Sequence, residues 1–279
     1  MKRSFVKMQG CGNDYIYFDC LTKELPQPEK WSRKLSDRHF GIGGDGIVLI
    51  CPSETADAKM RMFNADGSEG KMCGNAIRCV GKYLYESGAV SKKEMTIETL
   101  SGIKRLILTV SGKEVLSVTV DMGSPILGAK QIPTLFNQDT VIDHPLKVNG
   151  EQYHVTCVSM GNPHCVLFMN EVETLPIEKI GPQFENHSMF PERINTEFIH
   201  VIRRNELRMR VWERGSGETW ACGTGACAAV VAAVLNGYCD EGADVTVHLN
   251  GGDLVIRDVG ETVWMTGAAV KVFEGTIEL

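Results

Sequence analysis

Two short segments contain the residues of this chain that are best suited to acid–base chemistry. They are Met72-Cys73-Gly74-Asn75-Ala76 and Ala221-Cys222-Gly223-Thr224-Gly225, and each places a cysteine directly before a predicted helix. The first N–H groups of a helix lack partners within it, and the helix dipole adds partial positive charge there. Both effects favour a thiolate over a thiol. The same N–H groups can hold a carboxylate, and the glycines permit its close approach.

Paired thiols of this kind can invert the configuration of a carbon acid. If the two helix starts face each other across a pseudo-twofold axis, they would hold one ligand carboxylate with a thiol on each side of the adjacent carbon. One thiolate would remove the proton, and the other thiol would deliver a proton to the opposite face. The N–H groups would stabilise the negative charge that develops on the carboxylate. The alternative is that both cysteines only pack in the core, as most buried cysteines do.

The chain repeats itself at an offset of 149 residues (222 minus 73), without gaps. The matches fall on Gly, Asn, Cys and Glu: Gly12-Asn13 with Gly161-Asn162, Glu69 with Glu218, Cys73-Gly74 with Cys222-Gly223, and Gly102 with Gly251. Asn75 aligns with Thr224, and both side chains are short and form hydrogen bonds. The period is far longer than the roughly 20 to 50 residues of repeat arrays. The sequence therefore predicts two similar halves.

Each half is expected to consist of strands, one helix and further strands. Alternating or β-branched runs predict strands at 47–50, 59–63 and 106–110 in the first half, and at 155–158, 198–202 and 207–212 in the second. Helices are predicted at 75–86 and 224–235, each after a Cys-Gly element. This order predicts an α/β (α+β) fold with two pseudo-symmetric domains from internal duplication, each a bent mixed β-sheet wrapped around a central helix.

Composition excludes several classes of protein. A chain of 279 residues suits one large or two smaller domains, and its net charge of −6 disfavours a nucleic-acid partner. The uncharged stretch Trp220–Cys239 is strongly apolar only over Ala226–Leu235, which is too short to cross a bilayer. Ten cysteines without C-x-x-C spacing argue against a zinc site. We therefore expect a cytoplasmic protein with reduced thiols, no membrane span and no metal.

The segment Gly41–Gly46 matches the G-x-G-x-x-G pattern of dinucleotide-binding loops. That pattern must follow a strand and begin a helix. Here it follows a predicted helix end and leads into the predicted strand 47–50, so nucleotide binding is disfavoured. Dependence on pyridoxal phosphate requires a lysine aldimine, which the sequence neither supports nor excludes.

Over essentially its whole length the sequence resembles the diaminopimelate epimerases, PLP-independent amino-acid epimerases of lysine and peptidoglycan precursor biosynthesis. The resemblance is carried by seven motifs: Gly12-Asn13-Asp14-Tyr15, Phe63-Asn64-Ala65-Asp66-Gly67-Ser68-Glu69, Cys73-Gly74-Asn75, Gly161-Asn162-Pro163-His164, Phe190-Pro191-Glu192-Arg193-Ile194-Asn195, Trp212-Glu213-Arg214-Gly215 and Ala221-Cys222-Gly223-Thr224-Gly225.

The resemblance implies conversion of LL-diaminopimelate to meso-diaminopimelate by two-base proton transfer at the α-carbon, without a cofactor. It implies that Cys73 and Cys222 are catalytic, with support from His164 and Glu213. It assigns substrate binding to the following residues: Asn13, Asn64, Gly74, Asn75, Asn162, Asn195, Glu213, Arg214, Gly223 and Thr224. It also implies a homodimer, an N-terminal domain of residues 1–122 plus 268–279, and a C-terminal domain of residues 123–267.

These residue types fit a substrate with two amino-acid ends. Arg214 can form paired hydrogen bonds with the far carboxylate, and Glu213 or asparagine carbonyls can accept from the far ammonium. The offset supports the set, since adding 149 to 13, 46, 64, 73 and 75 gives 162, 195, 213, 222 and 224. One position departs from the family: some members carry glutamine where this chain has Gly46, so any contact of that side chain is absent here.

Three alternatives remain at this point. A proline racemase or hydroxyproline epimerase also uses paired thiols, but a substrate without a second amino-acid end leaves Glu213 and Arg214 without a role. A non-catalytic amino-acid-binding protein would not need both Cys73 and Cys222. A thiol redox protein is disfavoured because these cysteines lie 149 positions apart in separate halves.

Overall fold

The computed structural model describes residues 2–279, which form two compact units. The first unit extends to Asp121 and includes Thr266–Leu279, and the second is Met122–Met265. These limits lie within two residues of the domain limits expected from the resemblance. The strand β17 (Val263–Gly267) contains the point at which the chain passes from the second unit back to the first.

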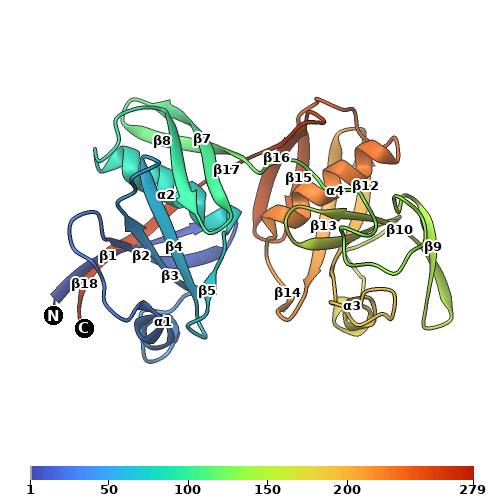
Figure 1. Ribbon diagram of the computed structural model, residues 1–279, viewed down its shortest axis with the longest axis horizontal. Coiled ribbons are helices and arrows are strands. Elements are labelled where there is room, and N and C mark those ends of the chain that lie inside the picture. The colour runs from blue at the N-terminus through green and yellow to red at the C-terminus, as the bar shows by residue number, and fades with distance from the viewer. Residues whose placement is uncertain (1) are drawn as a thin grey trace. The chain divides into compact units, whose positions relative to one another are not determined.

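The first unit is a mixed sheet around one buried helix (Figure 1). Its elements are β1 (Lys2–Gly10), β2 (Asn13–Asp19), α1 (Pro28–Ser36), β3 (Gly46–Cys51), β4 (Ala58–Asn64), β5 (Glu69–Gly70), α2 (Gly74–Glu86), β6 (Glu94–Thr99), β7 (Gly102–Ser111), β8 (Glu114–Asp121) and β18 (Val270–Glu278). The helix α2 contacts β1, β2, β7 and β8. Its residues from Gly74 to Lys82 are all buried.

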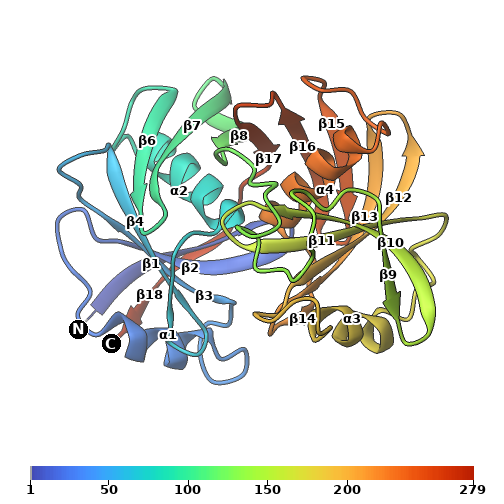
Figure 2. The same ribbon diagram turned by 45° about the vertical axis from the view of Figure 1, so that its right-hand side comes forward.

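The second unit has the same plan (Figure 2). Its elements are β9 (His144–Val148), β10 (Glu151–Ser159), β11 (Pro163–Met169), α3 (Ile177–Glu185), β12 (Asn195–Arg203), β13 (Glu206–Glu213), β14 (Gly217–Glu218), α4 (Gly223–Leu235), β15 (Val245–Leu249) and β16 (Gly252–Asp258). The apolar helix α4 is enclosed by β10, β11, β12 and β16, which confirms that it is a core helix. Within residues 2–279, no helix is long and apolar enough to span a membrane.

The duplication is confirmed by strand register. In the parallel pair β2–β3, Tyr15 lies opposite Gly46, and in the parallel pair β11–β12, His164 lies opposite Asn195. Both members of the second pair are displaced from the first by 149 residues. The helices α2 and α4 keep the same offset, beginning at Gly74 and Gly223. The predicted strands lie within β3, β4, β7, β10, β12 and β13, so the expected fold class is confirmed.

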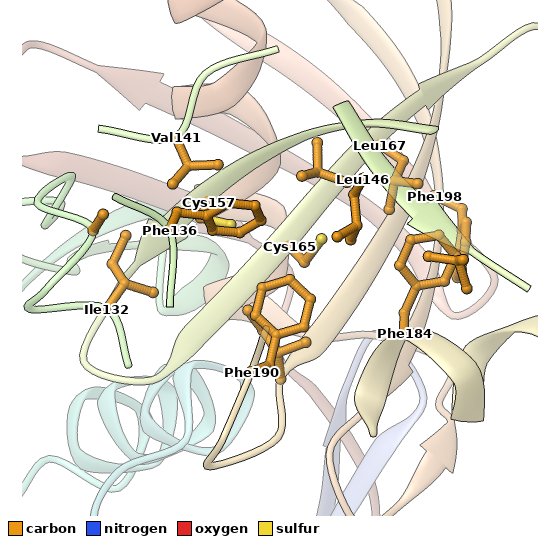
Figure 3. Packing of buried hydrophobic residues seen from close by; sticks show 14 of the residues in the cluster. Ile132, Phe136, Val141, Leu146, Cys157, Cys165, Leu167, Phe184, Phe190 and Phe198 are labelled. Carbon is orange, nitrogen blue, oxygen red and sulfur yellow. The ribbon is translucent and has the colours of Figure 1, made fainter. Parts of the chain in front are cut away.

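The strand β12 separates two different environments in the second unit. Side chains alternate between the faces of a strand, so Phe198 and Glu197 point in opposite directions. Phe198 packs against Phe184 of α3 with ring centroids 5.8 Å apart, within the apolar cluster of Figure 3. Glu197 lies on the face toward α4, close to Gly225. A carboxylate therefore lies beside the start of a helix whose own side chains are nearly all apolar.

Candidate active site

Cys73 and Cys222 are the N-cap residues of the two buried helices. Both have extended backbone conformations, with φ/ψ of −135°/121° at Cys73 and −120°/110° at Cys222. The sulfur of Cys73 accepts the N–H of Ala76 at 3.5 Å, and that of Cys222 accepts the N–H of Gly225 at 3.4 Å. Each sulfur occupies the position of the side-chain oxygen in an ordinary helix cap. Both cysteines are therefore at helix starts, as the sequence predicted.

In the first unit, the side chain of Asn13 contacts the sulfur of Cys73. The Sγ of Cys73 donates to Asn13 Oδ1 at 3.2 Å, and Asn13 Nδ2 donates to Asp45 Oδ2 at 2.7 Å. The neighbouring Asn75 is buried, and its Oδ1 has no hydrogen-bond partner among residues 2–279. Buried amide oxygens are rarely left unpaired, so this atom is available to a ligand. Asn64, at the end of β4, donates its Nδ2 to Ser68 Oγ at 3.0 Å.

Gly46 is a glycine for steric reasons. A Cβ at this position would collide with the carbonyl oxygen of Phe63 in the adjacent strand β4, and it would lie 2.9 Å from the ring of Tyr15. A glutamine here would require movement of the backbone. In this chain the close approach of β4 to β3 therefore leaves no room for a side chain at Gly46.

Around Cys222, the second unit provides a chain of polar groups. The Sγ lies 3.5 Å from Thr224 Oγ1, which accepts from Asn162 Nδ2 at 3.2 Å. The amide oxygen of Asn162 lies 3.1 Å from His164 Nε2. Glu213 accepts from the hydroxyl of Thr219, and its charge acts on the Cys222 thiol. The structure thus brings four predicted site residues, Asn162, His164, Glu213 and Thr224, to one thiol.

Asn195 and Arg214 are linked through the backbone. Asn195 donates its Nδ2 to the carbonyl of Pro163 at 2.8 Å, and its Oδ1 accepts the N–H of Arg214 at 2.9 Å. The guanidinium of Arg214 donates to the carbonyl of Glu192 at 2.9 Å. Asn195 therefore fixes the backbone at Arg214, and both the nitrogen and the oxygen of its side-chain amide form hydrogen bonds.

Glu197 is a residue of this site that was not predicted from the sequence. Its Oε1 lies 2.7 Å from His164 Nδ1, and the side chains of both residues are 0% exposed. The repeat gave no indication, because the matched position in the first half is Val48. The available signal was a lone carboxylate within an apolar strand, two residues after Asn195 and therefore on the same face.

Burial and negative charge outweigh the helix start in the electrostatics at Cys222, so the expectation that the helix start favours its thiolate is wrong for this cysteine. Desolvation is the largest cause that raises the pKa of this thiol well above its ordinary value, and the charges of Glu213 and Glu197 raise it further. Burial also raises the pKa of Glu213. Residues 2–279 contain no group of three or more His, Cys, Asp or Glu side chains placed to hold a metal ion.

We predict that Glu213→Gln lowers the pKa of Cys222, because removal of a nearby negative charge makes the thiolate less unfavourable. The measurement is the rate of iodoacetamide labelling of the Cys222 peptide as a function of pH, followed by mass spectrometry. Glu218→Gln is the control, since Glu218 pairs with Arg210 instead. A Cys222 labelling profile that stays in place, or moves to higher pH, would show that Glu213 does not act on this thiol.

Solved structures define the class of this fold. The chain is similar to a phenazine biosynthesis protein of the PhzF family from Bacillus anthracis, with a TM-score of 0.73 and 16% identity over 100% of both chains. It is also similar to a probable proline racemase from Agrobacterium radiobacter K84, with a TM-score of 0.71 and 15% identity, covering 99% of this chain and 93% of that one. The fold is therefore that of the PhzF proteins and proline racemases.

Closer relatives identify the family. The family model for diaminopimelate epimerase matches residues 5–128 and 156–272. A diaminopimelate epimerase from Acetivibrio thermocellus is 55% identical over 277 residues, covering 99% of this chain and 98% of the relative. One from Methanococcus maripaludis is 53% identical over 277 residues and covers 99% of each. The chain belongs to the diaminopimelate epimerase family, a family of isomerases.

Proposed function

We propose that this chain interconverts LL- and meso-diaminopimelate as a cytoplasmic enzyme of lysine and peptidoglycan precursor biosynthesis. The observation that carries the proposal is the pair of cysteine N-caps at matched positions of two duplicated units, in a chain 55% identical to a diaminopimelate epimerase. The cysteines supply thiol acid–base groups, and the helix starts supply N–H donors for a carboxylate.

In the proposed reaction, one thiolate removes the α-proton and the electron pair of the broken C–H bond is delocalised into the substrate carboxylate. The other thiol donates its proton to the opposite face of the same carbon and becomes the thiolate. The free N–H groups at Gly74-Asn75 and Gly223-Thr224 stabilise the additional charge on the carboxylate. The unpaired Oδ1 of Asn75 is suited to accept from the α-ammonium group. No cofactor or metal takes part in these steps.

The remaining predicted site residues are assigned to supporting roles and to the second amino-acid end. Arg214 binds the far carboxylate, because its planar guanidinium matches a carboxylate with two parallel hydrogen bonds. Asn195 acts by holding the backbone of Arg214. Asn13 orients the thiol of Cys73, and Asn162 orients the hydroxyl of Thr224 beside Cys222. Asn64 and Glu213 accept hydrogen bonds from ammonium groups of the substrate. Glu213 also raises the pKa of Cys222, and His164 acts on that thiol through Asn162 and Thr224.

We predict that Cys73→Ala and Cys222→Ala each reduce kcat for LL-diaminopimelate by about 10²-fold to 10⁴-fold or more, because each removes one of the two proton-transfer groups. The assay follows optical rotation without added pyridoxal phosphate or metal. Cys51→Ala and Cys227→Ala are matched controls, since Cys51 is half-buried like Cys73 and Cys227 is buried in α4.

Rapid turnover by either active-site variant would refute the assignment of two thiols. Turnover of proline in place of diaminopimelate by the unmodified protein would refute the proposed substrate.

We further propose that the enzyme is a homodimer. The strand β18 exposes three apolar side chains: Val270, Val272 and Phe273, which are 42%, 55% and 46% exposed. Apolar groups clustered on a surface mark contacts with other proteins, and a second copy of the chain would cover them. Together with the resemblance, this surface favours a dimer formed through the first unit.

Sedimentation velocity is therefore expected to give twice the chain mass of 30.7 kDa. Val272→Asp should produce monomers, because it places a charge in the proposed contact. Val259→Asp is the control, since Val259 is an exposed valine of the second unit. A monomeric wild-type protein, or a Val272→Asp variant that remains dimeric, would contradict the proposed contact.

A further inference from the structure

The two duplicated units differ at three matched positions close to the helix start. At the offset of 149 residues, Tyr15 matches His164, Val48 matches Glu197, and Ala76 matches Gly225. In the first unit all three positions are buried and carry no ionic group. In the second unit they are replaced by an imidazole, a carboxylate and a glycine.

In the second unit the three replacements depend on one another. Glu197 Oε1 lies 2.7 Å from His164 Nδ1, and a Cβ at position 225 would lie 2.7 Å from the same carboxylate oxygen. An alanine at 225, as at position 76, would therefore displace the carboxylate. Gly225 provides the space through which Glu197 reaches both the imidazole and the start of α4.

The buried carboxylate is a poor source of stability. The side chains of Glu197 and His164 are 0% exposed, and Glu197 Oε2 has no hydrogen-bond partner among residues 2–279. Burying a charge with few partners costs free energy, and buried ion pairs are often replaced by apolar residues without loss of stability. Val48 in the first unit shows that an apolar residue suits this place in the fold. The pair is therefore better explained by a role in positioning.

The carboxylate determines which nitrogen of His164 carries a hydrogen. An ionised carboxylate only accepts hydrogen bonds, so Nδ1 must donate to Glu197. This leaves Nε2 as the nitrogen that faces Asn162, at 3.1 Å from Oδ1. From Asn162 the contacts continue to Thr224 Oγ1 at 3.2 Å and to Cys222 Sγ at 3.5 Å. Glu197 is thus at the far end of an unbroken chain of polar contacts to the thiol.

We propose that Glu197 is a positioning residue for epimerisation, which fixes the Nδ1–H form of His164 and thereby orders Asn162 and Thr224 against Cys222. The inference rests on the proposed function for the role of Cys222. Glu197 does not touch the substrate. It acts through His164, as the carboxylate of a catalytic triad acts through its histidine.

This order links the proton on His164 to the proton on Cys222. With a hydrogen on Nε2, Asn162 accepts from the ring and donates its amide to Thr224, whose hydroxyl then donates to the Cys222 thiolate. Without that hydrogen, the amide of Asn162 turns and donates to Nε2. Thr224 then donates to Asn162 Oδ1 and accepts from the Cys222 thiol. The ionisable groups that face this chain are Glu197 of β12 and Glu213 of β13.

The kinetic test uses Glu197→Gln, which keeps the shape of the side chain and removes its charge. We expect kcat for LL-diaminopimelate to fall about tenfold to 100-fold with KM changed less than about twofold, as for other residues that orient a functional histidine. In a His164→Asn background the same change should have no further effect, because Glu197 acts only through His164. The proposal would be overturned if Glu197→Gln left kcat unchanged in the wild-type background. It would also be overturned if the change lowered kcat by the same factor in the His164→Asn background as in the wild-type background.

The spectroscopic test does not depend on activity. In protein labelled with 15N-histidine, which gives seven side chains to assign, Nδ1 of His164 should carry a hydrogen in the wild-type protein at neutral pH, and the Glu197→Gln variant should show loss of that form. An unprotonated Nδ1 in the wild-type protein would overturn the proposal.

Asp258→Asn, at another buried carboxylate of the second unit, is the control and should change neither kcat nor the ring signals. A wild-type protein that does not epimerise diaminopimelate would refute the proposed function, while the ring signals would still decide the role of Glu197.

Discussion

The proposed chemistry depends on the contact between a cysteine sulfur and the N–H groups at the start of a buried helix. In α2 and α4 the sulfur accepts from the third residue of the helix, in the place of a serine or aspartate oxygen. For this contact to matter, the helix start must be held rigidly and shielded from water. The sheet of each unit meets this need by enclosing the helix, and the apolar sequence of α4 is a consequence of that enclosure. Under the proposed function, the duplicated fold holds one such thiol in each unit.

The two cysteine N-caps share a backbone conformation but differ in the charged residues near them. Beneath the start of α2 lies the fully buried guanidinium of Arg78, which donates to the carbonyl of Gly74 at 3.2 Å. The matched residue in α4 is Cys227, and the charges near Cys222 belong to Glu213 and Glu197. A cation thus accompanies one helix start and carboxylates accompany the other. Under the proposed function, one thiol removes a proton while the other delivers one, and different charges beside the two sulfurs suit these different steps.

Much of this site could be predicted from sequence because it depends on local signals. The helix starts follow from Cys-Gly before an apolar run, and the single offset of 149 residues predicted two similar halves, which the strand register confirms. The contact between His164 and Glu197 could not be predicted, since it joins two strands through positions whose counterparts, Tyr15 and Val48, have different chemistry. The need for glycine at Gly46 depends on how closely β4 passes. The helix α3, with Pro182 inside it, also lacked a clear signal.

The central claim is that two separate thiols exchange protons with one carbon, and solvent deuterium tests it most directly. In D2O, starting from LL-diaminopimelate, the thiol that delivers to the product has already exchanged with solvent, while the thiol that took the substrate proton can return only that proton. The account predicts that early product carries deuterium at the inverted carbon while recovered substrate remains largely protiated. Equal early labelling of substrate and product would contradict it, because a single base that reaches both faces would distribute its hydrogen to both isomers.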